Sequence, residues 1–210
     1  MDLFARIDAV RARRDVLAHP FYQRWSNGEL TRADLALYSG QYRHAVVALA
    51  RATDRAAQTA DPELHSMLAE HAAEEAQHVA LWDDFVAEMD GDVAAGPTPE
   101  TEHCAAAWTG GEQDTLLERL VGIYAIEAAQ PAISAVKADG LRTLYGVRSD
   151  AATAYFDLHA ERDREHAAEG RELIERLLDG ADEDALVARA DAVLAANWEL
   201  LDGVERATAR

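Results

Sequence analysis

The sequence is poor in the residues that form disulfides, loops and membrane spans. It has one cysteine, Cys104, which excludes an intramolecular disulfide, and only five prolines and twelve glycines among 210 residues. No apolar run approaches the ~18 residues that a transmembrane helix needs. The first six residues, Met-Asp-Leu-Phe-Ala-Arg, lack the basic-then-apolar pattern of a signal peptide. We therefore expect a cytoplasmic protein.

Positive charge is also scarce. Twenty Lys and Arg residues face 39 Asp and Glu residues, which gives a formal net charge of -19. Such an acidic chain is a poor partner for nucleic acids and for anionic membranes, so we expect neither. Lys137 is the only lysine in the chain, in the middle of an expected helix. All other residues with a positively charged side chain are arginines, so a single lysine at this position marks it as a residue of interest.

What the sequence has is helical periodicity. Hydrophobic residues make up 49% of the chain, alanine is abundant, and no segment alternates as a strand would. We predict an all-α protein, one domain over residues 1–210, folded as a compact bundle of about seven helices. The expected helices cover residues 2–18, 31–58, 61–89, 100–108, 112–138, 149–179 and 182–207, with an aromatic turn at 21–25. Pro131 should kink the fifth of these near 127–131.

Three metal-competent side chains share one stripe of the helix at 149–179. His159, Asp163 and His166 stand at i, i+4 and i+7, so they fall within about 60° of one another around the helix axis. Two imidazoles with carboxylates are the ligands of non-haem iron or manganese. The stripe therefore predicts half of a metal site.

Two other helices offer the remaining ligands. Glu75 and His78 have the Glu-x-x-His spacing of carboxylate-bridged di-metal bundles. Glu127 has apolar neighbours on both sides, and an isolated buried carboxylate is so costly that it should be paired, protonated or bound to metal. Together with the stripe, these residues could hold two Fe ions, or Fe and Mn, and leave positions open for O2; zinc suits the set less well.

These motifs resemble those of the haem-oxygenase-like di-metal oxidases and oxygenases, relatives of the TenA and PqqC bundles. That superfamily has a Glu and a His on one helix, a Glu on a later helix, and then His-x3-Asp-x2-His. Within it, the chain looks most like the chlamydial group named protein associating with death domains, which makes p-aminobenzoate. The resemblance covers most of the chain and includes Phe21-Tyr22-x2-Trp25, His78-x2-Leu81-Trp82, Tyr124-x2-Glu127, Lys137-x2-Gly140 and Tyr155-Phe-x2-His159.

The resemblance implies an unusual activity. In the p-aminobenzoate group the enzyme is its own substrate: a tyrosine matching Tyr22 is excised to become the aromatic ring, and a lysine matching Lys137 is the implicated amino donor. Tyr38, Tyr42 and Tyr155 match other aromatic positions that could carry radicals. Relatives are often dimers, so the resemblance also implies a homodimer.

The helix at 61–89 departs from that group. The group has its first Glu ligand seven residues before the His, and this chain has His71 at that position. Glu75, three before His78, has the spacing of other members of the superfamily, the fatty-acid decarboxylases and N-oxygenases. Glu70 and Glu74 are also within reach, so the sequence leaves the first-helix ligand open among these four, with Glu75 preferred.

Other functions stay open at this point. A di-iron oxygenase of the same fold could instead oxidise a small amine, amino acid or fatty acid. A thiamine-fragment hydrolase of the TenA type would need a cysteine nucleophile, and Cys104 lies outside the long helices. A non-catalytic bundle would turn the ligand stripe toward solvent.

Overall fold

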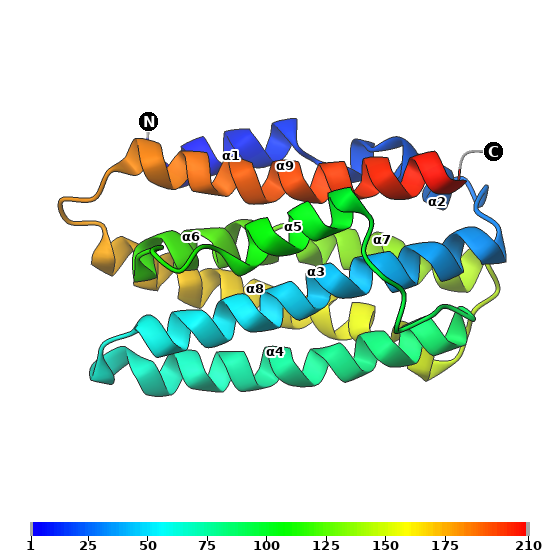
Figure 1. The fold of residues 1–210 in the computed structure, drawn as a ribbon, viewed down its shortest axis with the longest axis horizontal. Coiled ribbons are helices and arrows are strands. Elements are labelled where there is room, and N and C mark those ends of the chain that lie inside the picture. Colours follow the sequence, from blue (N-terminus) through cyan, green and yellow to red (C-terminus); the bar gives the residue numbers. More distant parts are fainter. Residues whose placement is uncertain (1, 209–210) are drawn as a thin grey trace.

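A computed structural model describes residues 2–208, which form nine α-helices, one short 3-10 helix and no strand (Figure 1). The predicted all-α fold is confirmed. The elements are α1 (Leu3–Arg13), η1 (Val16–Ala18), α2 (Pro20–Ser26), α3 (Arg32–Thr59), α4 (Pro62–Glu88), α5 (Pro99–Thr109), α6 (Leu116–Glu127), α7 (Gln130–Thr143), α8 (Asp150–Leu177) and α9 (Glu183–Thr208).

The helix count exceeds the expected seven for two reasons. The aromatic segment at 21–25 is a helix, α2, which begins at Pro20. Proline is favourable in the first turn, because the backbone N–H that it lacks would have no partner within the helix there. The expected helix at 112–138 is divided into α6 and α7, since Pro131 cannot continue the helix that Glu127 ends. The predicted kink is thus a complete break.

Side-chain caps fix the starts of two helices that frame the core. Thr31 and Asp34 form a capping box at α3, and Thr115 and Glu118 form another at α6. In each box the threonine hydroxyl accepts from the backbone N–H three residues on, and the carboxylate accepts from the backbone N–H of the threonine. These contacts satisfy donors that a helix start leaves unpaired.

The long helices run along the length of the molecule and pack side by side (Figure 1). Helix α4 packs on α3 and α8, and α8 also packs on α6 and α7, while α9 covers α1, α5 and α6. The facing surfaces of α4, α6 and α8 are therefore interior, and the ligand stripe of α8 faces inward. Among the described residues, no helix is both long and apolar enough to cross a membrane.

Candidate metal centre

Helices α4 and α8 carry the same pattern of metal-competent side chains. Each has a histidine, a carboxylate four residues later and a second histidine three residues after that. The two stripes are His71, Glu75 and His78 on α4 and His159, Asp163 and His166 on α8. Residues with this spacing lie on one face of a helix, so each helix presents two imidazoles and one carboxylate to the shared interface.

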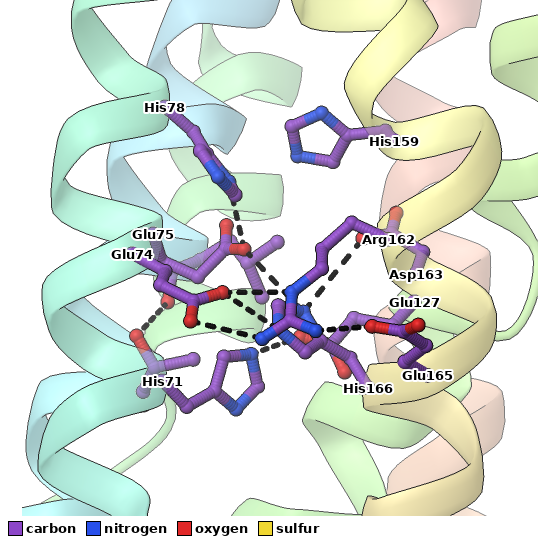
Figure 2. Close-up of polar contacts among 12 residues, drawn as sticks. His71, Glu74, Glu75, His78, Glu127, His159, Arg162, Asp163, Glu165 and His166 are labelled. Carbon is purple, nitrogen blue, oxygen red and sulfur yellow. Dashed lines mark hydrogen bonds and ion pairs between the residues drawn. The ribbon is translucent and has the colours of Figure 1, made fainter.

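The stripes meet in antiparallel order. The ring centroids of His78 and His159 lie 4.6 Å apart at one end, and those of His71 and His166 lie 4.1 Å apart at the other. Figure 2 shows the two pairs, with Glu75 between them. Antiparallel packing of two equal stripes thus creates two neighbouring positions, each with a pair of imidazoles.

Carboxylates complete both positions. Glu127, the last residue of α6, places Oε1 2.8 Å from Nε2 of His71. Glu75 places Oε1 2.9 Å from Nδ1 of His78 and 3.9 Å from Nδ1 of His166, so one carboxylate reaches both ends. Oδ1 of Asp163 is also 3.9 Å from Nδ1 of His166.

Ligand atoms of these side chains form two groups in which every atom lies within 4.8 Å of the others. Glu75 belongs to both groups, as a carboxylate that bridges two ions would. One group is His71, Glu75, Glu127 and His166, and the other is Glu75, His78 and His159.

The inward-facing atoms have no hydrogen-bond partner among the described residues. The nitrogen–oxygen pairs of His71 with Glu127 and of His78 with Glu75 lie at ion-pair distance but do not meet hydrogen-bond geometry. The unpaired atoms are Nε2 of His71, Oε1 of Glu75, Nδ1 of His78, Oε1 of Glu127, Nε2 of His159, both carboxylate oxygens of Asp163 and Nδ1 of His166. Buried polar atoms are nearly always paired, so this set fits bound metal ions.

The opposite ring nitrogens of two histidines are held by the protein. Nδ1 of His159 lies 2.7 Å from the backbone oxygen of Tyr155, which leaves Nε2 free to bind a metal. Nε2 of His166 lies 3.1 Å from Glu74, whose two oxygens also accept from the guanidinium of Arg162 at 2.9 Å. Hydrogen bonds of this kind fix the ring orientation and tautomer of metal-ligating histidines.

Burial shifts Asp163 and His159 toward their neutral forms, whereas the charges around His71 and Glu75 raise the pKa of the first and lower that of the second. Burial, together with the negative charges of Glu127 and Glu75, raises the pKa of Asp163 to about 9. Burial also lowers the pKa of His159 to about 4, so its imidazole is neutral at pH 7. A neutral imidazole is ready to bind a cation, and a divalent cation would displace the proton of the aspartic acid.

The structure brings together the six preferred ligands and His71, one of the four candidates left open on α4, although Asp163 lies beside His166 and outside the two groups. All six are buried, and His71 is partly buried. Of the other residues that the sequence left open on α4, Glu70 is exposed and Glu74 pairs with Arg162 outside the cluster. The signal for His71 was in the sequence: His71-x3-Glu75-x2-His78 repeats the spacing of the α8 stripe.

The predicted tyrosines and the lysine form a second buried cluster. The Tyr22 and Tyr38 hydroxyl oxygens are 2.8 Å apart, and Nζ of Lys137 lies 5.2 Å from the ring centre of Tyr22 and 4.5 Å from that of Tyr42. Tyr155 stacks on His159, with ring centroids 3.9 Å apart. Tyr155 therefore links this aromatic cluster to the metal-competent one.

Cys104 does not have the surroundings of a nucleophile. Its side chain is fully buried on α5, and burial raises the pKa of the thiol far above its ordinary value. A reactive cysteine needs the reverse, a lowered pKa and access to a substrate. Cys104 is therefore a small packing residue.

Comparison with known proteins identifies the family. The sequence profile of a family described as iron-containing redox enzymes matches residues 37–198, more than three quarters of the chain. The chain belongs to this family. The buried histidines and carboxylates are consistent with that membership, since they are a ligand set that suits iron.

Curated relatives of this chain include 4-aminobenzoate synthases. The Nitrosomonas europaea protein is 29% identical over 95% of this chain and 89% of its own length. The Chlamydia trachomatis protein is 31% identical over 87% of this chain and 84% of its own length. These are distant homologues, and the matches extend over nearly the whole chain.

Solved structures confirm the haem-oxygenase-like fold. A TenA homologue from Pseudomonas syringae superposes with a TM-score of 0.84 at 18% identity, covering 97% of this chain and 91% of that one. A Shewanella denitrificans protein with a heme oxygenase-like fold superposes with a TM-score of 0.72 at 21% identity, covering 99% and 93%. At such identities the likeness establishes the fold alone.

Proposed function

We propose that this protein is a di-iron, or iron–manganese, O2-activating oxidase that forms 4-aminobenzoate from its own side chains. The observation that carries the proposal is the convergence of four imidazoles and three carboxylates whose inward-facing atoms are unpaired. The 4-aminobenzoate synthase relatives support the choice of product.

The chain would hold the metals through its two matching stripes. His71, His166 and Glu127 would bind one ion and His78 and His159 the other, with Glu75 shared. When bound, the two ions would supply the redox-active centre at which O2 is reduced, and the oxidised side chain would supply the electrons. Asp163 would add a further carboxylate beside His166. Glu74 and the Tyr155 carbonyl keep the free nitrogens of His166 and His159 directed inward.

A tyrosine side chain already contains most of the product. 4-Aminobenzoate is a benzene ring with one attached carbon and a nitrogen at the para position, and tyrosine has the same ring with Cβ and a para hydroxyl. Overall, the conversion would break the Cα–Cβ bond and leave a glycine residue at position 22, and one O2 would supply the two oxygens of the carboxylate formed at Cβ. The nitrogen of Lys137 would replace the ring hydroxyl, and the oxygen that the ring loses would end on Cε of the lysine, so that atoms and electrons balance. Tyr22 is buried and hydrogen-bonded to Tyr38, so its ring is held in one place for this chemistry.

The surroundings of Lys137 suit an amino donor. Its ammonium group is buried among aromatic rings, and burial alone lowers its pKa to about 7. Within residues 2–208, no carboxylate forms an ion pair with it, so no negative charge offsets the effect of burial. A neutral amine has a free electron pair and is the nucleophilic form of lysine.

A column of aromatic rings connects Tyr22 with His159. Tyr155 stacks on His159, Trp82 lies 4.8 Å from Tyr155, and Tyr42 lies 5.1 Å from Trp82, measured between ring centroids. Tyr38 follows at 5.4 Å from Tyr42 and bonds the Tyr22 hydroxyl. An electron removed from Tyr22 would cross this column in short steps between neighbouring rings.

Isotope labelling tests the proposal because the chain has only one lysine. Protein grown on lysine labelled with ¹⁵N at Nζ and on ring-¹³C tyrosine carries the nitrogen label at Lys137 alone. After anaerobic loading with Fe(II), or with Fe(II) and Mn(II), and exposure to O2 without added substrate, we expect 4-aminobenzoate with both labels. At most one molecule should form per chain, and the peptide containing Tyr22 should lose mass.

Matched variants complete the test. Tyr22→Phe and Lys137→Met should form no product, whereas Tyr145→Phe, a tyrosine bonded to the Trp25 carbonyl outside the column, should retain activity. Unlabelled product, or an intact Tyr22 peptide in protein that has made product, would show that the ring comes from another source.

A further inference from the structure

A small cavity lies against the candidate metal centre, between α4, α6 and α8. Its inner wall is formed by metal-competent side chains, its middle by aliphatic ones, and its outer rim includes exposed residues. The inner wall is His71, Glu127 and His166; the middle includes Leu68, Leu120, Ile123 and Leu173; and the rim includes Met67, Glu169 and Gly170. The cavity thus leads from the surface to the unpaired atoms of the cluster.

The cavity is too small for an organic substrate. Its volume is about 40 Å³. One water molecule needs ~10–15 Å³ by this measure, and a cavity that accepts benzene is ~150 Å³. The space therefore suits a diatomic molecule or a few waters, and excludes an amino acid or a fatty acid. Between the ligands and the rim its walls are aliphatic apart from Tyr124, so this part of the cavity offers little to hydrogen-bond water and favours an apolar gas.

We propose that this cavity is the access path and waiting site for O2. The inference rests on the proposed oxidase function and deepens it, because it assigns the opening beside the ligands to the gas alone. This opening has no room for an external organic molecule, which is compatible with a substrate built into the chain.

Gly170 gives the means to close this path. It lies on α8 four residues after His166 and three before Leu173, so it continues the inward-facing stripe of the helix. A Cβ added at Gly170 meets no atom within 4 Å, and the backbone there does not need glycine. A longer side chain at this position would extend along the cavity without displacing the helix.

Xenon binding tests the cavity without any metal. Xenon occupies apolar cavities that bind small apolar molecules. Crystals of the metal-free protein under xenon pressure should show xenon between Leu68, Ile123 and Leu173, and crystals of Gly170→Met should show none there. Ala168→Met places the same side chain on the exposed face of α8 and should bind xenon as the natural protein does.

The second arm measures the reaction with O2. In protein loaded anaerobically with Fe(II), Gly170→Met should slow the oxidation of the iron by O2 about tenfold, which corresponds to ~1.4 kcal/mol of added barrier. Bound iron per chain should stay unchanged, and Ala168→Met should react at the natural rate.

The two arms separate the possible failures. No xenon in the cavity of the natural protein, or an unchanged oxidation rate in Gly170→Met that excludes xenon, would overturn the access path. Xenon at the predicted place in a protein that binds no iron would instead contradict the proposed function while leaving the apolar gas cavity established.

Discussion

Replacing Lys137 by methionine should stabilise the metal-free protein, and more so as the pH falls from 10 to 7. Burial lowers the pKa of Lys137 from 10.5 to about 7. Each pH unit between these values is worth ~1.4 kcal/mol, so the buried amine lowers the free energy of unfolding by about 5 kcal/mol at pH 7. The surrounding rings favour the charged form by ~0.5–2 kcal/mol, which leaves an expected gain of about 3–5 kcal/mol.

The sign of the pH dependence follows from the lowered pKa. Above pH 10.5 the lysine is neutral in both the folded and the unfolded chain, and it has no effect on stability. As the pH falls to 7, the unfolded chain binds a proton that the folded chain does not, so the natural protein loses stability. Below pH 7 both states bind the proton and the loss stays constant. Methionine has similar size and no charge, so Lys137→Met removes this loss.

Urea unfolding at pH 7, 8, 9 and 10 measures the effect. The difference between Lys137→Met and the natural protein should shrink by ~1.4 kcal/mol for each pH unit on the way up. Arg51→Met, which removes one exposed positive charge, serves as the control and should show a small, pH-independent difference. A stability difference for Lys137→Met that does not vary with pH, or a loss of stability at pH 7, would refute the buried neutral amine.

Three further predictions follow from the packing and the ligands. Gly140→Ala should lower the free energy of unfolding by ~1–3 kcal/mol in a denaturation assay, because the added Cβ would lie 2.5 Å from Nε1 of Trp25. Gly170→Ala adds a Cβ in open space and should raise the free energy of unfolding by ~1 kcal/mol in the same assay. Trp82→Leu should slow product formation at unchanged metal content, because it interrupts the aromatic column. Trp108 is equally buried but lies at the edge of the column, so Trp108→Leu should form product at the natural rate. Equal rates for the two variants would argue against electron transfer through the column. Anaerobic Fe(II) at about 100 times its dissociation constant should raise the free energy of unfolding by ~2.7 kcal/mol per site, seen as a higher melting temperature, and an unchanged melting temperature would mean that no folded-state site exists.

Local periodicity was enough to predict the ligands that lie on one helix. His159, Asp163 and His166 repeat with the period of the helix, so their common face follows from backbone geometry alone. Glu127 could be named because a carboxylate among apolar neighbours needs a partner. The sequence left His71 as one of four candidates on its helix, and its position opposite Glu127 depends on how α4 and α6 each pack against α8, which periodicity does not give.

Lys137 illustrates the limit of sequence reasoning in another way. Ile133 and Leu141, one turn to either side, place it on the buried face of α7. The rings that surround its amine come from α2, α3, α4 and α8, which are distant in sequence. Their meeting is a result of tertiary packing, so the lowered pKa of this lysine could not be predicted from its sequence neighbours.

The central claim is that two metal ions bind between α4 and α8. Metal analysis and anomalous diffraction of protein loaded with iron, or with iron and manganese, test it most directly. We expect two ions per chain in the natural protein and His103→Ala, whose histidine is exposed. His71→Ala should keep only the ion between His78 and His159. One ion or none in the natural protein, ions located elsewhere, or full occupancy in His71→Ala would contradict the claim.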